Sequence, residues 1–487
     1  MHNKTGTFIC LMLGILFVQN SYAQSDSIDI FLKNEMQKRG IPGLQIAIVQ
    51  KGKIIKTGNY GLSNVQDSIP VDSRTLFTIN SITKAFTGIA IMQLVEAGKL
   101  NLSSPVSDYL SNLPDSWKPV TIQQLLSHTS GIPDIVDEEE AVLISPYGLQ
   151  ASWKQISTLP MDFKPGEKFS YNQTNYLLLG KIIDTLSGMP FTEFIQKEQL
   201  QKAGMPNTIR AGFGATKDVI MHAAQEYQYR KGKLNNMFFS FDYPLQTAAG
   251  MSSTATEMAN WVIALQSNQF LKDKKNMTAL WTPAKLNNGK TGGFSNLLNG
   301  YAAGWPIIVR AAHPAAAPVG GGRSAVFVYP NDDLTIIVLT NLSGSTPDAF
   351  IDEIAGFYIP EMKAANGFGL SPSIPLLRIE LEKSAYKNAI PSFEKFKKAG
   401  AGFELPEAEV NSWGYTLIQQ KRIKDALEIF LLNVYLYPSS ANAFDSLGEI
   451  YAELGDRELA IKNYEASLKL NPQNSNAQNQ LQKLKTN

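Results

Sequence analysis

A serine and a lysine three residues apart, Ser81 and Lys84, are the residues of this chain best placed to do chemistry. They open an apolar segment, and the sequence predicts a helix over residues 81–100. Positions i and i+3 share a helix face, so the Lys84 amine can reach the Ser81 hydroxyl and act as its base. The helix N-terminus adds partial positive charge and backbone N–H groups that would stabilise an acyl oxyanion. The pair therefore predicts a serine nucleophile.

The same spacing occurs twice more, at Ser384 with Lys387 and at Ser392 with Lys395. These later pairs lie in the lysine-rich segment 381–398, which is typical of a solvated helix face. Only the first pair opens an apolar helix. We therefore assign the chemistry to Ser81 and Lys84.

The elements that must position this pair predict an α+β domain. Strand-like segments lie at both ends of the first 360 residues, and helical segments lie between them. The expected strands are 43–49 and 54–61, joined as a hairpin, and 325–329 and 334–340. The expected helices are 28–39, 85–98, 121–128, 176–187, 254–266 and 347–358. One sheet built from the two ends, with a helical region inserted, is the expected architecture.

The C-terminal part predicts an all-α domain of helical repeats. Five residues recur 34 positions later with similar types: Gly414, Leu417, Ala426, Phe430 and Pro438 become Gly448, Tyr451, Ala460, Tyr464 and Pro472. This period resembles the tetratricopeptide pattern, whose glycine and alanine let paired helices approach closely. A partial match one period upstream, at Ile379, Glu380, Ser392 and Phe396, predicts a degenerate first repeat. Such repeats offer a surface for a protein or peptide partner, or pack on the catalytic domain.

The N-terminus predicts export. Lys4, an apolar run at 8–18 and Ser21-Tyr22-Ala23 form the pattern of a cleaved signal peptide over residues 1–23. The run is shorter than the ~20 residues that a membrane span needs. Cys10, the only cysteine, lies inside it, so the mature protein is expected to be free of disulfides and periplasmic or secreted.

The charge balance and the histidines exclude other classes of function. The chain has 44 basic and 43 acidic residues, which does not favour nucleic acid or an anionic membrane surface as partner. The four histidines, His2, His128, His222 and His313, show no metal-ligand spacing. No metal or other cofactor is therefore predicted, and a zinc β-lactamase is disfavoured.

A second motif, Tyr171-Asn172-Gln173, leads to a family resemblance. With this motif and the pair Ser81 and Lys84, residues 25–360 resemble the serine β-lactamase and penicillin-binding protein family. Supporting matches lie at 126–131, 248–254, 304–305 and 339–341. The resemblance is strongest to the class C β-lactamase branch with its DD-peptidases and esterases. It implies that Tyr171 abuts the serine and shares the proton transfer, aided by the nearby lysine ammonium. Gln173 stands where the family has Asn and would recognise a substrate amide in altered geometry.

The third motif departs from the family. Where the family has Lys or His, a variable residue and Gly on a strand beside the nucleophile, this chain has Pro318-Val319-Gly320. Proline supplies no cation. Gly320 and Gly321 remain, and the N–H of Gly321 together with that of Ser81 is expected to hold an oxyanion.

Three nearby basic residues are assigned by their types. Arg323 is predicted to bind a substrate carboxylate, with a structural role as the alternative. His313 and His128 are expected to be structural, with His128 in a packing or hydrogen-bonding role.

These observations predict an order of domains and a function. The order is a signal peptide (1–23), a hydrolase domain (24–364), a linker (365–375) and helical repeats (376–487). The expected function is an exported serine hydrolase that forms an acyl-enzyme at Ser81 with a β-lactam, a D-amino-acid peptide or an ester. The missing cation of the third motif favours an ester or another peptide. The alternative is a catalytically weakened peptide-binding or scaffold protein that uses the repeats.

Overall fold

The computed structural model describes residues 27–137, 142–214, 219–230, 233–238, 241–365, 373–400, 403–419 and 422–486. The chain divides into two compact units, Met1–Gln228 with Leu234–Pro360 and Tyr229–Lys233 with Glu361–Asn487. The predicted signal peptide and residues 366–372 of the predicted linker lie outside the described residues.

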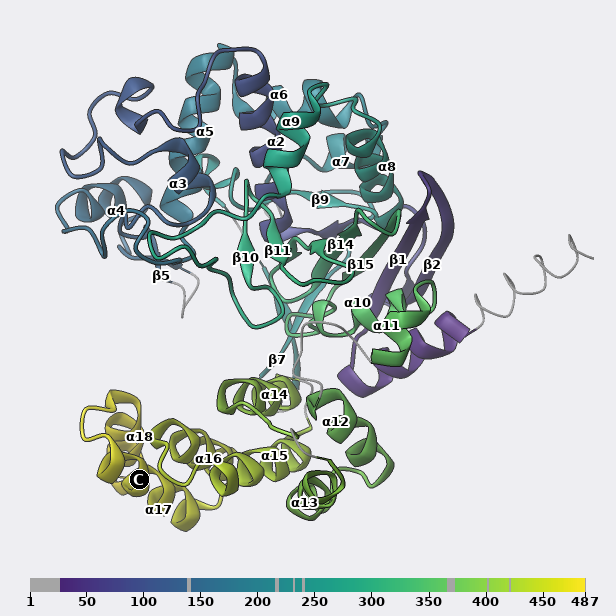
Figure 1. Cartoon of the computed structure of the whole chain (residues 1–487), viewed down its shortest axis with the longest axis vertical. Helices are drawn as coiled ribbons and strands as arrows, with labels where there is room; N and C mark the ends of the chain where they lie inside the picture. Colours follow the sequence, from purple (N-terminus) through teal and green to yellow (C-terminus); the bar gives the residue numbers. More distant parts are fainter. Residues whose placement is uncertain are drawn as a thin grey trace, which may run out of the picture. The chain divides into compact units, whose positions relative to one another are not determined.

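The first unit is built on an antiparallel sheet that joins its two ends. The strand order is β10-β11-β12-β14-β15-β1-β2-β3, and β13 also pairs with β14. In Figure 1 the purple strands β1 and β2 therefore lie beside the green strands β14 and β15. The predicted sheet from both ends is confirmed. Its strands are β1 (Gly43–Gln50), β2 (Lys53–Asn64), β3 (Ile69–Pro70), β10 (Gly300–Tyr301), β11 (Pro306–Ile308), β12 (Ala315–Ala316), β13 (Val319–Gly320), β14 (Ser324–Tyr329) and β15 (Leu334–Thr340).

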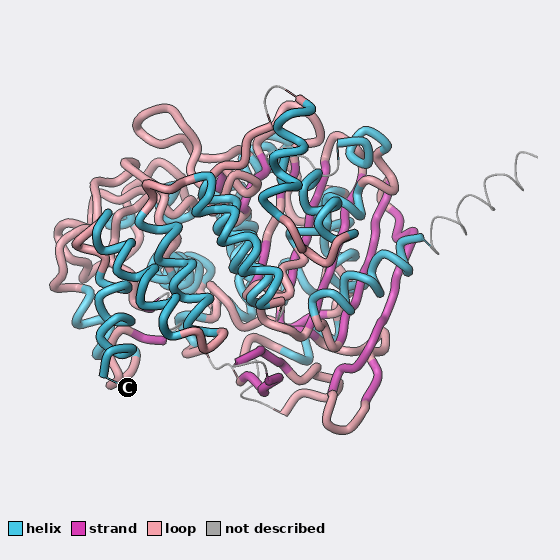
Figure 2. Tube along the Cα trace, turned by 90° about the horizontal axis from the view of Figure 1, so that it is seen from below, coloured by secondary structure: helices cyan, strands magenta, loops and turns pink. Residues whose placement is uncertain are grey.

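The central strands β1 and β15 are buried on both faces, because helices cover both. Their β-branched and aliphatic residues alternate between the two faces. Ala47 and Leu339 join the main core, while Ile46 and Val338, which are paired in register, are buried on the opposite face. Helix α8 (Ala255–Gln266) packs on β1 and β15, and α10 (Asp348–Ala355) packs on β14 and β15. Figure 2 shows the strands, in magenta, side by side with helices next to them.

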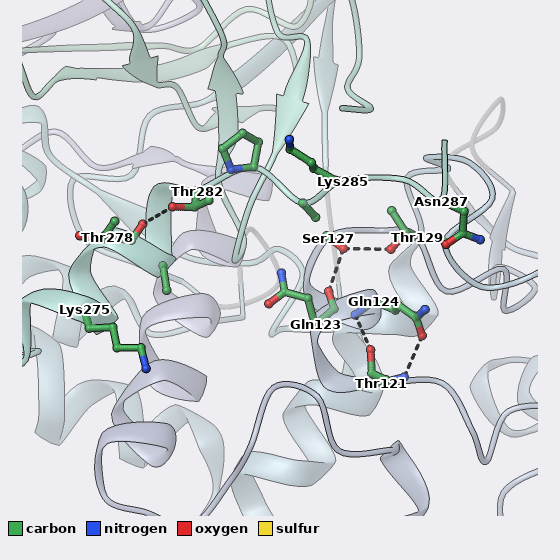
Figure 3. Close-up of a pocket in the computed structure, with 14 residues that line it drawn as sticks. Thr121, Gln123, Gln124, Ser127, Thr129, Lys275, Thr278, Thr282, Lys285 and Asn287 are labelled. Carbon is green, nitrogen blue, oxygen red and sulfur yellow. Dashed lines mark hydrogen bonds between the residues drawn. The ribbon is translucent and has the colours of Figure 1, made fainter. Parts of the chain in front are cut away.

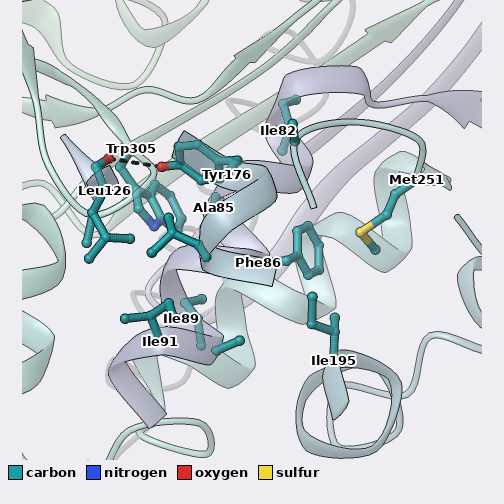
Figure 4. Packing of buried hydrophobic residues seen from close by; sticks show 14 of the residues in the cluster. Ile82, Ala85, Phe86, Ile89, Ile91, Leu126, Tyr176, Ile195, Met251 and Trp305 are labelled. Atoms are coloured by element: carbon teal, nitrogen blue, oxygen red, sulfur yellow. Dashed lines mark hydrogen bonds between the residues drawn. The ribbon is translucent and has the colours of Figure 1, made fainter. Parts of the chain in front are cut away.

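Helix α2 (Thr83–Glu96) runs through the core of the inserted helical region. It is buried along almost its whole length, which its apolar residues on all sides allow. Phe86 of α2 stacks on Trp261 with ring centroids 3.9 Å apart, and Trp261 stacks on Trp305 at 5.6 Å. Figure 4 shows Phe86 and Trp305 in this packing. The core thus fixes the helix that follows Ser81.

The remaining elements of the first unit are further helices and short strand pairs. The helices are 27–39 at the N-terminus, α3 (Ile122–Leu126), α4 (Leu149–Ile156), α5 (Gln173–Ser187), α6 (Phe191–Ile195), α7 (Pro206–Ala211) and α9 (Lys274–Trp281). Two-stranded pairs are formed by β4 (Phe77–Thr78) with β9 (Ser252–Ser253) and by β5 (Val136–Asp137) with β6 (Val142–Leu143). A further pair, β7 (Glu226–Arg230) with β8 (Lys233–Met237), includes residues 229–233, which are assigned to the second unit.

The second unit consists of paired helices, as the repeat pattern predicts. A Cβ added to Gly414 would lie 2.5 Å from the Phe430 ring, and one added to Gly448 would lie 3.0 Å from the Tyr464 ring. A β-carbon at either position would crowd the facing ring, so glycine favours these close helix approaches. A helix pair, α12 with α13, also occupies the position of the predicted degenerate repeat. The helices are α11 (Pro360–Ala365), α12 (Ser373–Lys383), α13 (Ala389–Ala399), α14 (Glu407–Gln419), α15 (Ile423–Leu436), α16 (Ala441–Glu453), α17 (Arg457–Leu470) and α18 (Ser475–Thr486).

Candidate active site

Ser81 lies in a 3₁₀ turn, η1 (Asn80–Ile82), that leads directly into α2. The predicted helix thus begins as a tighter turn, with Lys84 inside the α-helix. Asn80 has φ +46°, a left-handed conformation that asparagine tolerates better than most residues. Neither η1 nor α2 has a side-chain N-cap or an acidic residue in its first turn. No carboxylate of that turn therefore offsets the positive end of the helix beside the half-buried Ser81.

Lys84 is fully buried, yet its amine has polar partners. Its Nζ donates to Gln173 Oε1 at 2.8 Å and to the carbonyl oxygen of Ala248 at 2.9 Å. Nζ also lies 4.6 Å from the centroid of the Tyr171 ring and 5.1 Å from that of Tyr176. The structure therefore brings Lys84, Tyr171 and Gln173 together, one helical turn after Ser81.

A close approach of the backbone fixes Lys84 from the other side. Gly304 has φ +85°, and a Cβ there would lie 2.2 Å from the Lys84 carbonyl oxygen. A side chain at this position would push α2 away from the hairpin of β10 and β11. The Gly304-Trp305 match found in the sequence is thus a packing feature beneath the lysine.

Asp134, a residue that the sequence analysis missed, holds Gln173 in place at the start of α5. Asp134 accepts hydrogen bonds from the backbone N–H groups of Gln173, at 3.0 Å, and Thr174, at 3.3 Å. Burial raises the pKa of Asp134, although these hydrogen bonds favour its charged form. The only sequence signal was an aspartate shortly after the Ser130-Gly131 turn, which is too common to single out.

The glycine segment lies against the turn that carries Ser81. A Cβ on Gly320 would lie 2.0 Å from the carbonyl oxygen of Ile79, and one on Gly321 would lie 2.9 Å from Asn80 Nδ2. Strand β13 therefore runs beside η1, as the third motif requires. Pro318 is buried just before this strand, and its carbonyl oxygen accepts from the Val326 N–H. The predicted oxyanion role of Gly321 stays a prediction.

Arg323 is buried in an ion pair with Glu226, which argues against the predicted substrate clamp. The two side chains are only 3% and 0% exposed. Glu226 also accepts from Thr78 Oγ1 at 2.7 Å, and Thr78 Oγ1 accepts from Asn80 Nδ2 at 3.2 Å. Arg323 instead braces the residue before Ser81, and its Nε also donates to the Gly321 carbonyl oxygen at 3.3 Å. This is the structural alternative considered for it.

The two other basic candidates occupy different settings. His313 Nδ1 lies 2.8 Å from Asp332 Oδ1, and its carbonyl oxygen accepts from Arg310 Nε. His128 is fully buried against the Tyr171 ring, with centroids 4.5 Å apart. Burial and the nearby Lys84 charge lower the pKa of His128 well below its usual value, so the ring is neutral.

An aromatic cluster forms one wall of the site. The Tyr171 ring lies 5.0 Å from Phe294, which is 43% exposed, and Phe169 and Tyr301 contact Phe294 at 5.5 and 5.9 Å. The Tyr176 hydroxyl donates to the Leu126 carbonyl oxygen at 3.0 Å (Figure 4). Phe294 thus presents an apolar surface next to Tyr171. Sequence reasoning missed Phe294.

A separate depression of about 690 Å³ lies between α3, α9 and the segment after α9 (Figure 3). Many of its polar side chains bond within the protein. Ser127 Oγ lies 3.0 Å from Thr129 Oγ1, Thr121 and Gln124 form a capping box, and Thr282 donates to the Thr278 carbonyl oxygen. We therefore place the candidate active site at Ser81, outside this depression.

Within the described residues, no group of three or more His, Cys, Asp or Glu side chains is close enough to hold a metal ion. Within the same ranges, no helix combines the length and hydropathy of a membrane span.

Comparisons with family models match both units. The model described as Beta-lactamase matches residues 28–359, and the model described as Tetratricopeptide repeat matches residues 441–474.

Individual relatives agree with these matches. Protein flp of Staphylococcus aureus (strain N315) is 30% identical over 336 residues, which cover 67% of this chain and 65% of that protein. The chain thus spans slightly less than two thirds of this relative. The putative penicillin-binding protein PbpX of Bacillus subtilis (strain 168) is 29% identical over 293 residues, which are 57% of this chain and 72% of that protein. The octameric penicillin-binding protein homologue from Pyrococcus abyssi is 27% identical with a TM-score of 0.57, covering 67% of this chain and 75% of that one.

Proposed function

Because the chain belongs to the beta-lactamase family of serine hydrolases, we propose that it forms an acyl-enzyme at Ser81 and then hydrolyses it. The observation that carries this proposal is the setting of Lys84. A fully buried lysine with an amide and a carbonyl oxygen as hydrogen-bond partners lies one turn after a half-buried serine. Burial of such a side chain costs free energy, and a role in proton transfer at Ser81 accounts for that cost.

We assign the role of general base to Lys84. Gln173 Oε1 and the Ala248 carbonyl oxygen accept hydrogen bonds from its amine and hold it one turn after Ser81. In the proposed reaction, Ser81 Oγ attacks the carbonyl carbon while its proton passes to Lys84. The proton then passes, with Tyr171 as relay, to the leaving group as the scissile bond breaks. Water later cleaves the acyl-enzyme and regenerates Ser81.

Two groups support stabilisation of the oxyanion in this proposal. The N-terminus of η1 and α2 has no side-chain cap, and its backbone N–H groups would bind the reacting oxygen in this proposal, together with that of Gly321, which lies against Asn80 directly after β13. Removing one such donor typically costs on the order of 10²-fold or more in rate.

The substrate we favour is an ester or a peptide that needs no carboxylate clamp. Pro318 stands at the cationic position of the third motif, and Arg323 is paired with Glu226. The exposed Phe294 beside Tyr171 suits an apolar or aromatic group next to the scissile bond. We further propose that the protein works in the periplasm or outside the cell, as the N-terminal signal pattern predicts.

Labelling with an acyl-enzyme probe tests the proposal. A fluorophosphonate or a fluorescent penicillin should label the wild type and should not label Ser81→Ala. Ser392→Ala, which removes the serine of another pair with the same spacing, should be labelled like the wild type. Equal labelling of Ser81→Ala would overturn the nucleophile assignment. Hydrolysis of esters, D-amino-acid peptides and β-lactams by the labelled protein would then select the substrate class.

The helical repeats support a second candidate function, which is binding of a protein or peptide partner. Tetratricopeptide repeats are built for such contacts, and the matched repeat at 441–474 lies in a run of paired helices. A chain that is labelled at Ser81 but turns over no ester, peptide or β-lactam would favour this function.

A further inference from the structure

We propose that His128 is a positioning residue that fixes Tyr171 for proton transfer. The inference rests on the proposed function, because it assigns a role to His128 only in a reaction that uses Tyr171. His128 does not act on the substrate in this account. It acts through the tyrosine.

His128 holds the chain on both sides of Tyr171. The backbone carbonyl oxygen of His128 accepts from the Ser170 N–H at 2.9 Å. Its ring Nδ1 accepts from the Asn172 N–H at 3.1 Å. His128 thus binds Ser170 with its main chain and Asn172 with its side chain.

The ring of His128 also sets the orientation of the phenol. Its centroid lies 4.5 Å from that of Tyr171 and 4.7 Å from that of Tyr301. Tyr171 is therefore held by its own backbone and by its ring, on the side where Lys84 Nζ lies 4.6 Å from the ring centroid. A small rotation of the phenol would change the position of its hydroxyl relative to Ser81 and Lys84.

Two unfavourable features of His128 argue that packing alone does not explain it. Its backbone has φ +58°, a conformation that costs a β-carbon residue free energy. Because Nδ1 accepts a hydrogen bond, the hydrogen of the neutral ring is assigned to Nε2. Nε2 is buried and has no hydrogen-bond partner within the described residues. Buried unpaired donors are rare, and a functional constraint is one reason to keep one.

Three substitutions separate the hydrogen bond from size and from backbone strain. Asn places its Oδ1 near the position of Nδ1 and tolerates positive φ. Leu matches Asn in size but has no acceptor, and Gly tolerates positive φ but has neither acceptor nor ring. His222→Leu is the matched control, since His222 also has positive φ, at +65°, and its carbonyl oxygen also accepts a backbone N–H, from Leu76.

We expect His128→Leu and His128→Gly to lower kcat on an ester by about 10- to 100-fold, the cost of misplacing a catalytic group by about 1 Å. KM should change by less than about 3-fold, because no substrate contact is removed. His128→Asn should recover most of the lost rate, and His222→Leu should behave like the wild type. Titration of the labelled fraction with a fluorophosphonate corrects every rate for the amount of folded enzyme.

A double-mutant cycle with Tyr171→Phe decides whether His128 acts through the tyrosine. In the Tyr171→Phe background, His128→Leu should lower the rate of probe labelling by less than about 3-fold. A full 10- to 100-fold loss in that background would overturn the proposal, and so would a wild-type rate in His128→Leu. Equal losses in His128→Asn and His128→Gly would assign the effect to ring volume and would also overturn it. If His128→Leu does not fold, the Gly and Asn variants carry the same test. A wild type that no probe labels would instead overturn the proposed function itself.

Discussion

The chain contains the same serine–lysine spacing at the start of α2 and in the α12–α13 region, and the two regions differ in the burial of the lysine and in its partners. Lys84 is fully buried and binds an amide and a carbonyl oxygen. Lys395 is three residues after Ser392 on α13, has a 75% exposed side chain and reaches Glu380 at 3.5 Å. Spacing brings two side chains within reach, but burial and partners decide whether chemistry follows.

The third pair shows that the spacing does not even fix the local conformation. Ser384 lies in a turn after α12, where Ala385 and Tyr386 both have positive φ. Its Oγ contacts the carbonyl oxygens of Leu381 and Lys387, both at 3.2 Å. The hydroxyl is thus used to close a turn, a common role of serine outside helices.

Replacing the two lysines gives the largest expected difference between the regions. Lys84→Met should lower the rate of acylation by up to about 10⁴-fold, because it removes the general base. Lys395→Met should leave the rate unchanged. The measurement is the rate of labelling by a fluorophosphonate, with circular dichroism as the control for folding. Similar rates for the two variants would remove the distinction drawn between the pairs.

Ion pairs extend the comparison from activity to stability. Arg323→Met leaves Glu226 buried without its partner and should lower the free energy of unfolding by about 3–5 kcal/mol. Lys395→Met breaks only the exposed pair with Glu380 and should cost less than about 1 kcal/mol. Urea unfolding of the full chain measures both. A loss below 1 kcal/mol for Arg323→Met would show that the buried pair does not brace the turn before Ser81.

Much of the fold could be predicted because its patterns are local. The hairpin of β1 and β2, strand β15 and helices α5 and α8 follow from periodicity and turn residues. The glycines at 414 and 448 follow from the repeat, since each meets an aromatic ring of its partner helix. The convergence of Lys84, Tyr171 and Gln173 followed from the family resemblance.

The rest of the site depends on contacts between distant segments, which no local pattern encodes. The Ala248 carbonyl oxygen binds Lys84 across 164 residues, and any residue type could supply that oxygen. Arg323 seemed available for a substrate because Glu226, 97 residues away, gave no sign of being its partner. Asp134 and Phe294 were missed for the same reason, since their roles depend on the elements that they meet.

Burial of the His128 ring should make the free energy of unfolding depend on pH. His128 has a folded-state pKa well below 6.5, so below about pH 6.5 the unfolded chain binds a proton there that the folded chain does not. Its contribution to the free energy of unfolding is complete above pH 6.5 and falls as the pH decreases, by up to about 1.4 kcal/mol per pH unit. His128→Asn should remove this part of the slope, and His222→Asn should not. Unfolding curves between pH 5 and pH 7.5 test this, and an unchanged slope in His128→Asn would contradict a buried neutral ring.

The smallest expected effect compares two exposed aromatic side chains, Phe294 beside Tyr171 and the 49% exposed Tyr435 in α15. Phe294→Ser removes apolar surface from the site wall but leaves Ser81, Lys84 and Tyr171 in place. It should therefore lower kcat/KM for an aromatic ester by about 10-fold, the value of roughly 1.4 kcal/mol of apolar contact, and lower that for an acetyl ester by less than about 2-fold.

Tyr435→Ser is the matched control and should leave both values of kcat/KM unchanged, since its hydroxyl binds Glu394 within the repeats. Equal losses on the two esters in Phe294→Ser would mean that Phe294 supports Tyr171 rather than the substrate. An exposed aromatic side chain would then, like the serine–lysine spacing, indicate no function without the residues around it.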